Sequence, residues 1–457
     1  MGWLRRTKAV LLLEPETWLA YIYGQQFDKL RHLQDAEPRH KGWYFRVAIW
    51  LYFLLKNVKL KHDSSQIESD YLVFSGTMNQ KKSLESTLCE LKRRKTNVYA
   101  IAPRKILTKN KIEDDQYNAI YYSFLDVLKS VFLCVLRLKK LRNQLKDRSE
   151  LLTRNRLDSF LEVYNSLVYF DRLLIRVKPK VVIVSNDHNA FNKALIALAR
   201  NMGIKTVYMQ HASVSDLFPA LNVDYAFLDG ESALETYRKC EKNNCTSNPL
   251  IKNRKVFLTG QKKRLNTTFS KIQSDKVVGL ALNALDSLIE TEKLVRTLSE
   301  NEIRVRLRWH PGLSSKVIKE LKKTLERYSI EFSDPKIESL SDFFSHIRCL
   351  IAGNSSIHLE AALSHVVPIQ YEMGKSDFED YYGYVRNRVS FGARSIEGLL
   401  SIVERVESNE LRLDKTSIQF YSSTFGTEWE GREGELVCQI LMSIGKNPCT
   451  PISCINL

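Results

Sequence analysis

The stretch Cys349-Leu-Ile-Ala-Gly-Asn-Ser-Ser-Ile-His-Leu-Glu-Ala-Ala362 predicts a strand, a tight turn and a helix in direct succession. Its first residues form a short apolar run typical of a buried strand, and Gly353 permits a sharp exit from that strand. Asn354, Ser355 and Ser356 are residue types that cap helices, so we expect a helix to begin here. Free backbone N–H groups at a helix N-terminus, with two hydroxyls beside them, suit a phosphate group.

A second stretch, Arg308-Trp-His-Pro-Gly312, has the same layout. It follows a predicted strand, and a helix is predicted to start about two residues later, with Pro311 suited to its first turn. The carboxyl ends of parallel strands meet at one edge of a sheet, where open α/β sheets bind their ligands. We therefore expect His310, Ser355 and Ser356 to lie on one edge.

Strands and helices alternate along the rest of the chain, which predicts an α/β protein with doubly wound parallel sheets. A chain of 457 residues is long enough for two domains, each with its own core. A polar, basic stretch from Gln261 to Asp275 would link them. We predict an N-terminal aromatic and basic segment, then two Rossmann-like domains facing a cleft, with boundaries at 1–62, 63–265 and 266–457.

Composition is that of a soluble globular protein, with 44% hydrophobic and 26% charged residues. The formal net charge of +17 suits anionic partners such as nucleotide sugars, lipid phosphates or an acidic membrane surface. No zinc-ligand spacing, aromatic RNA motif or dense arginine tract occurs, which argues against nucleic acid as a partner. Eight scattered cysteines without a Cys-x-x-Cys pair fit the cytoplasm. We find neither a signal peptide nor an apolar run of the roughly 20 residues that a bilayer crossing needs.

Residues 42–55 are dense in aromatic side chains and are followed by Lys56, Lys59 and Lys61. Two interpretations stay open: a core helix with a basic end, or a helix lying in the interface of an anionic inner membrane. The second would make the protein peripheral on the inner face of the cytoplasmic membrane. A further helix, predicted from Phe124 to Leu141, has apolar residues at helical spacing, and core packing is the favoured use there.

Two doubly wound domains with phosphate-type turns in the second resemble the GT-B glycosyltransferase architecture. Arg-Trp-His310-Pro311 resembles the His-Pro motif, and Gly-Asn-Ser355-Ser356 the Ser-Ser motif, of bacterial sialyltransferases, polysialyltransferases and Kdo transferases. CDP-glycerol glycerophosphotransferases of teichoic acid synthesis have a similar arrangement. Gln-His211-Ala resembles the Gln-His-Gly turn in the first domain of these enzymes. The resemblance covers roughly residues 180–375.

The resemblance implies an inverting glycosyltransferase that takes a sugar from a nucleotide donor, CMP- or CDP-linked, and builds a bacterial surface polysaccharide, capsule or lipooligosaccharide. Its partners would be the donor and a lipid-linked or oligosaccharide acceptor. No Asp-x-Asp or other metal motif occurs. Enzymes of this architecture typically use helix dipoles and side chains at the leaving phosphate, so we expect no cofactor and no essential metal.

The resemblance also implies roles for individual residues. As general base for the acceptor hydroxyl, His211 is the first choice, Asp229 the second and Asp187 the third. The expected donor-binding residues lie on the turns of the second domain, with Glu360 facing the ribose and Asn283 the leaving phosphate: His310, Pro311, Asn354, Ser355, Ser356, Glu360 and Asn283.

Two positions depart from the pattern. Ala212 stands where the family turn has glycine, and the Leu-Asp229-Gly run has one carboxylate where sialyl and Kdo enzymes carry an acidic pair. The identity of the base therefore stays open. Three alternatives stay open as well: a teichoic-type polyol-phosphate transferase, a nucleotide-sugar 2-epimerase, and a capsule-assembly scaffold without activity.

Overall fold

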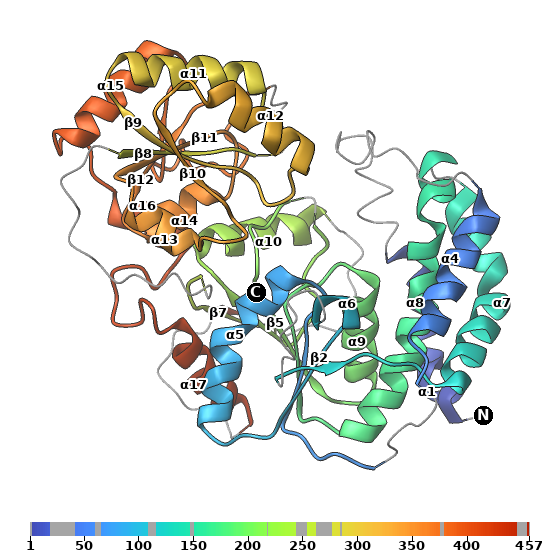
Figure 1. The fold of residues 1–457 in the computed structure, drawn as a ribbon. Coiled ribbons are helices and arrows are strands. Elements are labelled where there is room, and N and C mark those ends of the chain that lie inside the picture. The colour runs from blue at the N-terminus through green and yellow to red at the C-terminus, as the bar shows by residue number, and fades with distance from the viewer. Residues whose placement is uncertain are drawn as a thin grey trace. The chain divides into compact units, whose positions relative to one another are not determined.

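The chain folds into two compact units, each built on its own largely parallel sheet (Figure 1). Unit 1 comprises Met1–Lys263 and Glu433–Leu457, and unit 2 comprises Arg264–Arg432. The computed structural model describes residues 2–18, 42–59, 65–107, 116–146, 150–216, 218–243, 254–261, 277–283, 286–374, 379–445 and 455–456.

In the described part of unit 1, eight strands pair in the order β14-β7-β6-β5-β4-β1-β2-β3. The central strands are short runs of buried apolar residues, as parallel strands covered on both faces require. Gly203, at φ 74°, follows the end of the helix before β5, where a left-handed backbone favours glycine. The sheet and its connecting helices are β1 (Tyr71–Phe74), α5 (Met78–Arg93), β2 (Val98–Ala102), α6 (Arg104–Leu107), β3 (Asn118–Ala119), β4 (Val181–Val184), α9 (Ala190–Asn201), β5 (Lys205–Met209), β6 (Tyr225–Leu228), α10 (Glu231–Asn243), β7 (Lys255–Leu258) and β14 (Ile455–Asn456).

A group of helices at the side of this sheet contains the described part of residues 1–62 (Figure 1). The group is α1 (Gly2–Leu11), the 3-10 turn Pro15–Thr17, α4 (Trp43–Lys56), α7 (Phe124–Lys146) and α8 (Glu150–Val177). Buried Glu16 accepts two hydrogen bonds from Arg137, at 2.6 and 2.8 Å, which holds the 3-10 turn against α7. The indole of buried Trp50 donates to Asn165 at 2.9 Å, which holds α4 on α8.

In the described part of unit 2, six parallel strands pair in the order β10-β9-β8-β11-β12-β13. Serine side chains cap four of the described helices, which explains why those helices begin where they do. The elements are β8 (Val277–Ala281), α11 (Leu288–Glu300), β9 (Arg304–Arg308), α12 (Ser315–Leu325), β10 (Ile330–Ser333), α13 (Leu340–Ser345), β11 (Cys349–Ala352), α14 (Ile357–Leu363), β12 (Val367–Gln370), β13 (Phe391–Gly392), α15 (Ile396–Glu407) and α16 (Lys415–Tyr421).

The chain returns to unit 1 at its end, so the predicted extent of the second domain, 266–457, is wrong after Arg432. Helix α17 (Glu433–Gly445) packs on α5 so closely that Gly434 lies against the backbone of Ser86. Strand β14 then pairs antiparallel with β7. Except for Gln261, the predicted linker lies outside the described residues.

Candidate functional site

The predicted donor-binding residues of unit 2 follow three neighbouring strands. Asn283 comes after β8, His310 after β9, and the turn Gly353–Ser356 after β11. Strand β8 lies between the other two and is parallel to both, so all three ends share one edge of the sheet. At about 4.8 Å between strands, the ends of β9 and β11 lie roughly 10 Å apart. One phosphate-bearing ligand could contact side chains from all three.

His310 is exposed, and its Nδ1 accepts a hydrogen bond from the N–H of Gly312 at 3.1 Å. In the neutral ring this leaves the proton on Nε2, which is then free to donate to an anion. Pro311 does not stand in the first turn of a helix, contrary to our prediction. Helix α12 begins only at Ser315, and Ser314 caps it by accepting from the N–H of Val317. No helix N-terminus lies at Pro311, so the imidazole is the side chain of this turn that could donate to an anion.

The serine pair precedes α14, and the predicted capping is wrong for Ser356. Ser356 is the N-cap residue, but its side chain makes no capping hydrogen bond. The Ser355 hydroxyl accepts from the N–H of Ile357 at 3.4 Å, which is a weak bond. The amide oxygen of Asn354 accepts from the N–H of Tyr381 at 3.0 Å and so fixes a neighbouring loop. The Ser356 hydroxyl thus remains available to a ligand without loss of a helix cap.

His358 fixes the same turn from within the core. Its ring is buried, and Nε2 donates to the carbonyl oxygen of Gly353 at 2.8 Å. Burial lowers the pKa of His358 to about 4, so the ring is neutral at pH 7. The buried His358 ring therefore positions the turn through the carbonyl of Gly353. Glu360, also on α14, is half-buried.

Sequence reasoning missed two carboxylates beside Gly353. A Cβ atom added to Gly353 would lie 3.3 Å from both Asp286 Oδ1 and Glu372 Oε2, and 3.4 Å from Asn283 Nδ2. The other Asp286 oxygen accepts from the N–H of Asn283 at 2.7 Å. Burial raises the pKa of Asp286 to about 6, with a contribution from the charge of Glu372. Asp286 follows β8 and Glu372 follows β12, the two strands that flank β11. Their positions soon after predicted strands could have identified them from the sequence.

His358 and Asp286 should give opposite pH dependences. The folded-state pKa of His358, about 4, is below the unfolded value of about 6.5, so acidification from pH 6.5 to 4 costs up to about 3 kcal/mol of stability. The folded-state pKa of Asp286, about 6, is above the ordinary value for an aspartate, 3.8, so acidification through the same window stabilises the fold.

We therefore expect His358→Gln to gain stability relative to wild type as the pH falls from 7 to 4.5, and Asp286→Asn to lose it. The measurement is the denaturant midpoint of unit 2 at several pH values, taken as the variant-minus-wild-type difference because other carboxylates titrate in this range. Differences that do not change with pH would contradict both pKa assignments.

In unit 1, the predicted bases follow adjacent strands, with His211 after β5 and Asp229 after β6. Gln210 joins the two strand ends: its oxygen accepts from the N–H of Asp229 at 2.8 Å, and its amide donates to the carbonyl of Ala212 at 3.1 Å. His211 is half-buried, whereas Asp229 is 5% exposed. Gln210 thus fixes the turn that carries His211. These two bonds need both a donor and an acceptor, which explains a glutamine directly before His211.

The end of β4 carries a histidine–carboxylate pair, of which sequence reasoning named Asp187 as a possible base but not His188. His188 Nδ1 lies 3.0 Å from Asp187 Oδ1, and His188 Nε2 lies 3.0 Å from Asn186 Nδ2. The oxygen of Asn186 accepts from the backbone N–H groups of His188 and Asn189, which orients its nitrogen toward the ring. Nε2 is therefore an acceptor, and the proton on Nδ1 donates to Asp187.

Asp187 is buried and has further polar neighbours. The hydroxyl of Tyr237 donates to its second oxygen at 3.3 Å and lies 3.1 Å from the hydroxyl of Tyr208. Burial lowers the pKa of Lys193 to about 8, partly offset by the charge of Asp187. Since β4 is adjacent to β5, the three predicted bases lie at one edge of unit 1. Asp187 is better placed to orient His188 than to accept a proton itself.

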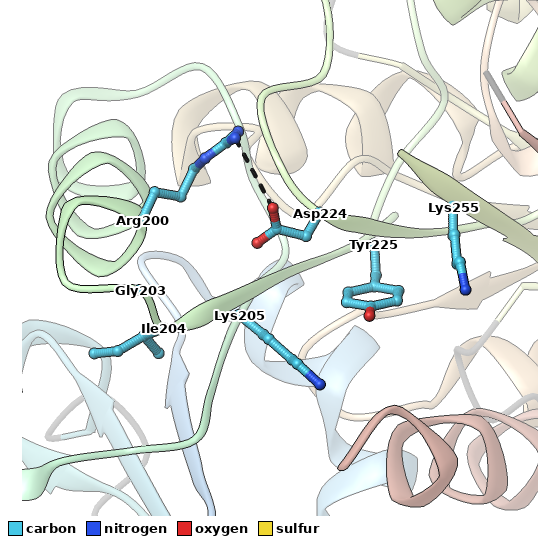
Figure 2. Close-up of a pocket in the computed structure, with 7 residues that line it drawn as sticks. All are labelled: Arg200, Gly203, Ile204, Lys205, Asp224, Tyr225 and Lys255. Carbon is cyan, nitrogen blue, oxygen red and sulfur yellow. Dashed lines mark ion pairs between the residues drawn. The ribbon is translucent and has the colours of Figure 1, made fainter. Parts of the chain in front are cut away.

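A hollow of about 380 Å³ lies at the opposite edge of the same sheet, where β5, β6 and β7 begin (Figure 2). Its lining includes Lys205, Lys255 and the ion pair between Arg200 and Asp224, 3.9 Å apart. The amine of Lys205 donates to the carbonyl of Ile444 in α17. This hollow is separate from the predicted bases, which follow the carboxyl ends of the strands.

Among the described residues, no three His, Cys, Asp or Glu side chains are grouped to hold a metal ion. Within the same residues, no helix combines the length and the apolar character needed to span a bilayer.

Comparison with solved structures identifies the architecture. A UDP-N-acetylglucosamine 2-epimerase is similar over 85% of this chain and 99% of its own, with a TM-score of 0.53 and 16% identity. The calicheamicin glycosyltransferase CalG4 is similar over 84% of this chain and 100% of its own, with a TM-score of 0.52 and 9% identity. The fold is of the GT-B type. The S. aureus MnaA–UDP complex shares this fold. It is similar over 84% of this chain and 99% of its own, with a TM-score of 0.51 and 12% identity.

At these identities the GT-B likeness establishes the fold alone. No protein-family profile matches the chain, and no curated protein matches its sequence.

Proposed function

We propose that this GT-B protein is an inverting glycosyltransferase that uses a nucleotide-activated sugar, CMP- or CDP-linked, to build a bacterial surface polysaccharide. One observation carries the proposal: the Nε2 donor of His310 and the hydroxyls of Ser355 and Ser356 share one edge of the sheet. They follow β9 and β11, the two strands that flank β8. In open α/β sheets this edge is the usual ligand site.

Unit 2 would bind the donor. The exposed imidazole of His310 would donate to a phosphate oxygen, and the two serine hydroxyls would donate to the same leaving group. Asp286 and Glu372 beside Gly353 accept hydrogen bonds and do not attract an anion, so they suit the hydroxyls of the nucleotide or sugar. Glu360 remains the proposed ribose contact on α14.

Unit 1 would bind the acceptor and supply the base. In the proposed step the acceptor oxygen attacks the anomeric carbon, the bond from that carbon to the donor phosphate breaks, and the nucleotide leaves with the electron pair. The hydroxyl proton passes to His211, the first candidate, or to Asp229. Gln210 contacts both turns and would hold either base in place.

A thermal-shift screen with CMP, CDP, UDP and GDP tests the donor assignment. We expect cytidine nucleotides to raise the melting temperature, because a ligand at 100 times its Kd stabilises the folded state by about 2.7 kcal/mol. No response to any nucleotide would contradict the proposal. A transfer assay with the cytidine-activated sugar would then establish the reaction.

A nucleotide-sugar 2-epimerase is the second candidate. Two of the structures with this fold are UDP-N-acetylglucosamine 2-epimerase and the MnaA–UDP complex. Buried Asp229 and His188, which Asp187 orients, would suit acid–base chemistry on a bound sugar. Selective stabilisation by UDP, together with epimerisation of UDP-N-acetylglucosamine in the absence of an acceptor, would favour this candidate over the transferase.

A further inference from the structure

Most of the large apolar side chains that are exposed in the described residues lie on two helices of unit 1, α4 and α7. Our sequence interpretation assigned α7 to core packing, and for its outer side this is wrong. Exposed apolar patches of more than a few hundred Å² are rare on soluble monomers and mark interaction sites.

Helix α7 is apolar on two opposite sides. Val127, Leu133 and Leu141 are buried against the rest of unit 1. At 100° per residue, a second apolar face points away from them. Its members are 50 to 66% exposed: Phe124 59%, Leu125 63%, Leu128 50%, Phe132 52%, Val135 66%, Leu136 57% and Leu138 56%.

Basic side chains continue this outer face of α7. Lys139, Arg142 and Lys146 are exposed and fall within the same angular range at the C-terminal end of the helix. The single carboxylate of α7, Asp126, is buried and paired with Arg172 at 2.8 Å. The outer face of α7 is therefore apolar along most of its length and basic at its end.

Helix α4 repeats the arrangement. Trp50 and Leu54 are buried, whereas Tyr44, Tyr52 and Leu55, on the opposite side, are 69, 57 and 54% exposed. Exposed lysines, Lys56 and Lys59, follow immediately, and the helix contains no carboxylate. Tyrosine is a residue type that favours the headgroup region of a bilayer.

The two helices are joined at their ends. The N–H of Lys59 donates to the carbonyl of Tyr122, and the N–H of Tyr122 donates to the carbonyl of Asn57, each at 2.9 Å. The end of α4 therefore adjoins the start of α7, and both helices pack on α8 (Figure 1). Helix α8 thus carries both α4 and α7, and the outer face of each is the side opposite its buried residues.

We propose that the outer faces of α4 and α7 bind the surface of an anionic lipid bilayer. Apolar side chains would enter the interface, and the flanking lysines and Arg142 would contact lipid phosphates. A second copy of the chain fits less well, because a two-fold contact would place these basic ends together with no carboxylate on either outer face to neutralise them. The inference depends on neither the donor nor the reaction.

Vesicle flotation of the full chain tests this inference, using phosphatidylcholine vesicles with and without 30% phosphatidylglycerol (about a third anionic lipid, in the range where polybasic surfaces respond). We expect wild type to float with the anionic vesicles. Leu128→Gln/Phe132→Gln/Leu136→Gln should weaken binding at least about tenfold, because three inserted side chains are lost. Lys139→Gln/Arg142→Gln/Lys146→Gln should weaken binding to anionic vesicles only, and high salt should reproduce that loss.

A matched control replaces exposed apolar residues of unit 2, Ile289→Gln/Ile337→Gln, and should bind as wild type does. All variants should keep the wild-type circular dichroism and the wild-type nucleotide response, which separates this inference from the proposed function. Failure of wild type to float, or equal flotation of the α7 apolar variant, would overturn it. Self-association that the α7 apolar variant abolishes, without lipid binding, would assign the faces to a second copy instead.

Discussion

Replacing both Ser355 and Ser356 by alanine should abolish stabilisation by the nucleotide and lower transfer activity by about 10²- to 10⁴-fold. The estimate follows from two hydrogen bonds to a charged phosphate at about 1.5–3 kcal/mol each. The fold should lose little. Ser356 makes no capping bond, and the bond that Ser355 accepts from Ile357 is long, at 3.4 Å.

The measurement pairs nucleotide titrations with initial rates for the double variant. Ser408→Ala is a suitable control, since this exposed serine ends α15. If the double variant keeps wild-type affinity for the nucleotide, the turn after β11 is not the phosphate site. A fall in the melting temperature without ligand, comparable to the loss of ligand response, would instead indicate a structural role.

Gly434→Ala should destabilise unit 1 by about 1–3 kcal/mol, or more where the backbone cannot move. The added Cβ would lie 2.7 Å from the carbonyl carbon and 2.9 Å from the carbonyl oxygen of Ser86. Both are backbone atoms of α5, so no side-chain rotation relieves the overlap. Helix α17 would have to separate from α5, weakening contacts of buried Val437 and Leu441.

Denaturant unfolding measures the loss, followed on unit 1 for Gly434→Ala and on unit 2 for its control. Gly398→Ala is the matched control, because Gly398 also lies in a helix and its added Cβ would meet only Ser395 Oγ, at an ordinary 3.5 Å. That variant should be unchanged or more stable by up to about 1 kcal/mol, from helix propensity. If Gly434→Ala lowered the stability of its unit no more than Gly398→Ala does, relative to wild type, α17 would not pack tightly on α5.

The local patterns in the sequence were sufficient to predict the central strands of both sheets, but not the edge strands β3, β10, β13 and β14. Runs such as Val181–Val184 and Cys349–Ala352 are buried strands, and the residues that follow them meet at one edge because the strands are parallel. The same reasoning predicted that His310 and Ser355 would share an edge. It could not reveal how Gly312 orients the imidazole, since that depends on the turn's backbone.

Long-range packing accounts for what sequence reasoning missed. Helix α7 has apolar residues on both its buried and its exposed side, so the apolar spacing cannot tell which side faces the core. Nothing in residues 433–445 specifies α5 as a partner, because an apolar helix fits many grooves. Asp286 lies beside Gly353 only because β8 pairs with β11, although the two strands are far apart in the chain.

The position of α17 has a consequence for how the protein is made. Unit 2 is one continuous insertion, 264–432, whereas unit 1 requires residues from both ends of the chain. During synthesis from the N-terminus, α17 does not cover the side of α5 around Ser86 until the ribosome has passed residue 445. Unit 2 can therefore fold before α17 is available to complete unit 1.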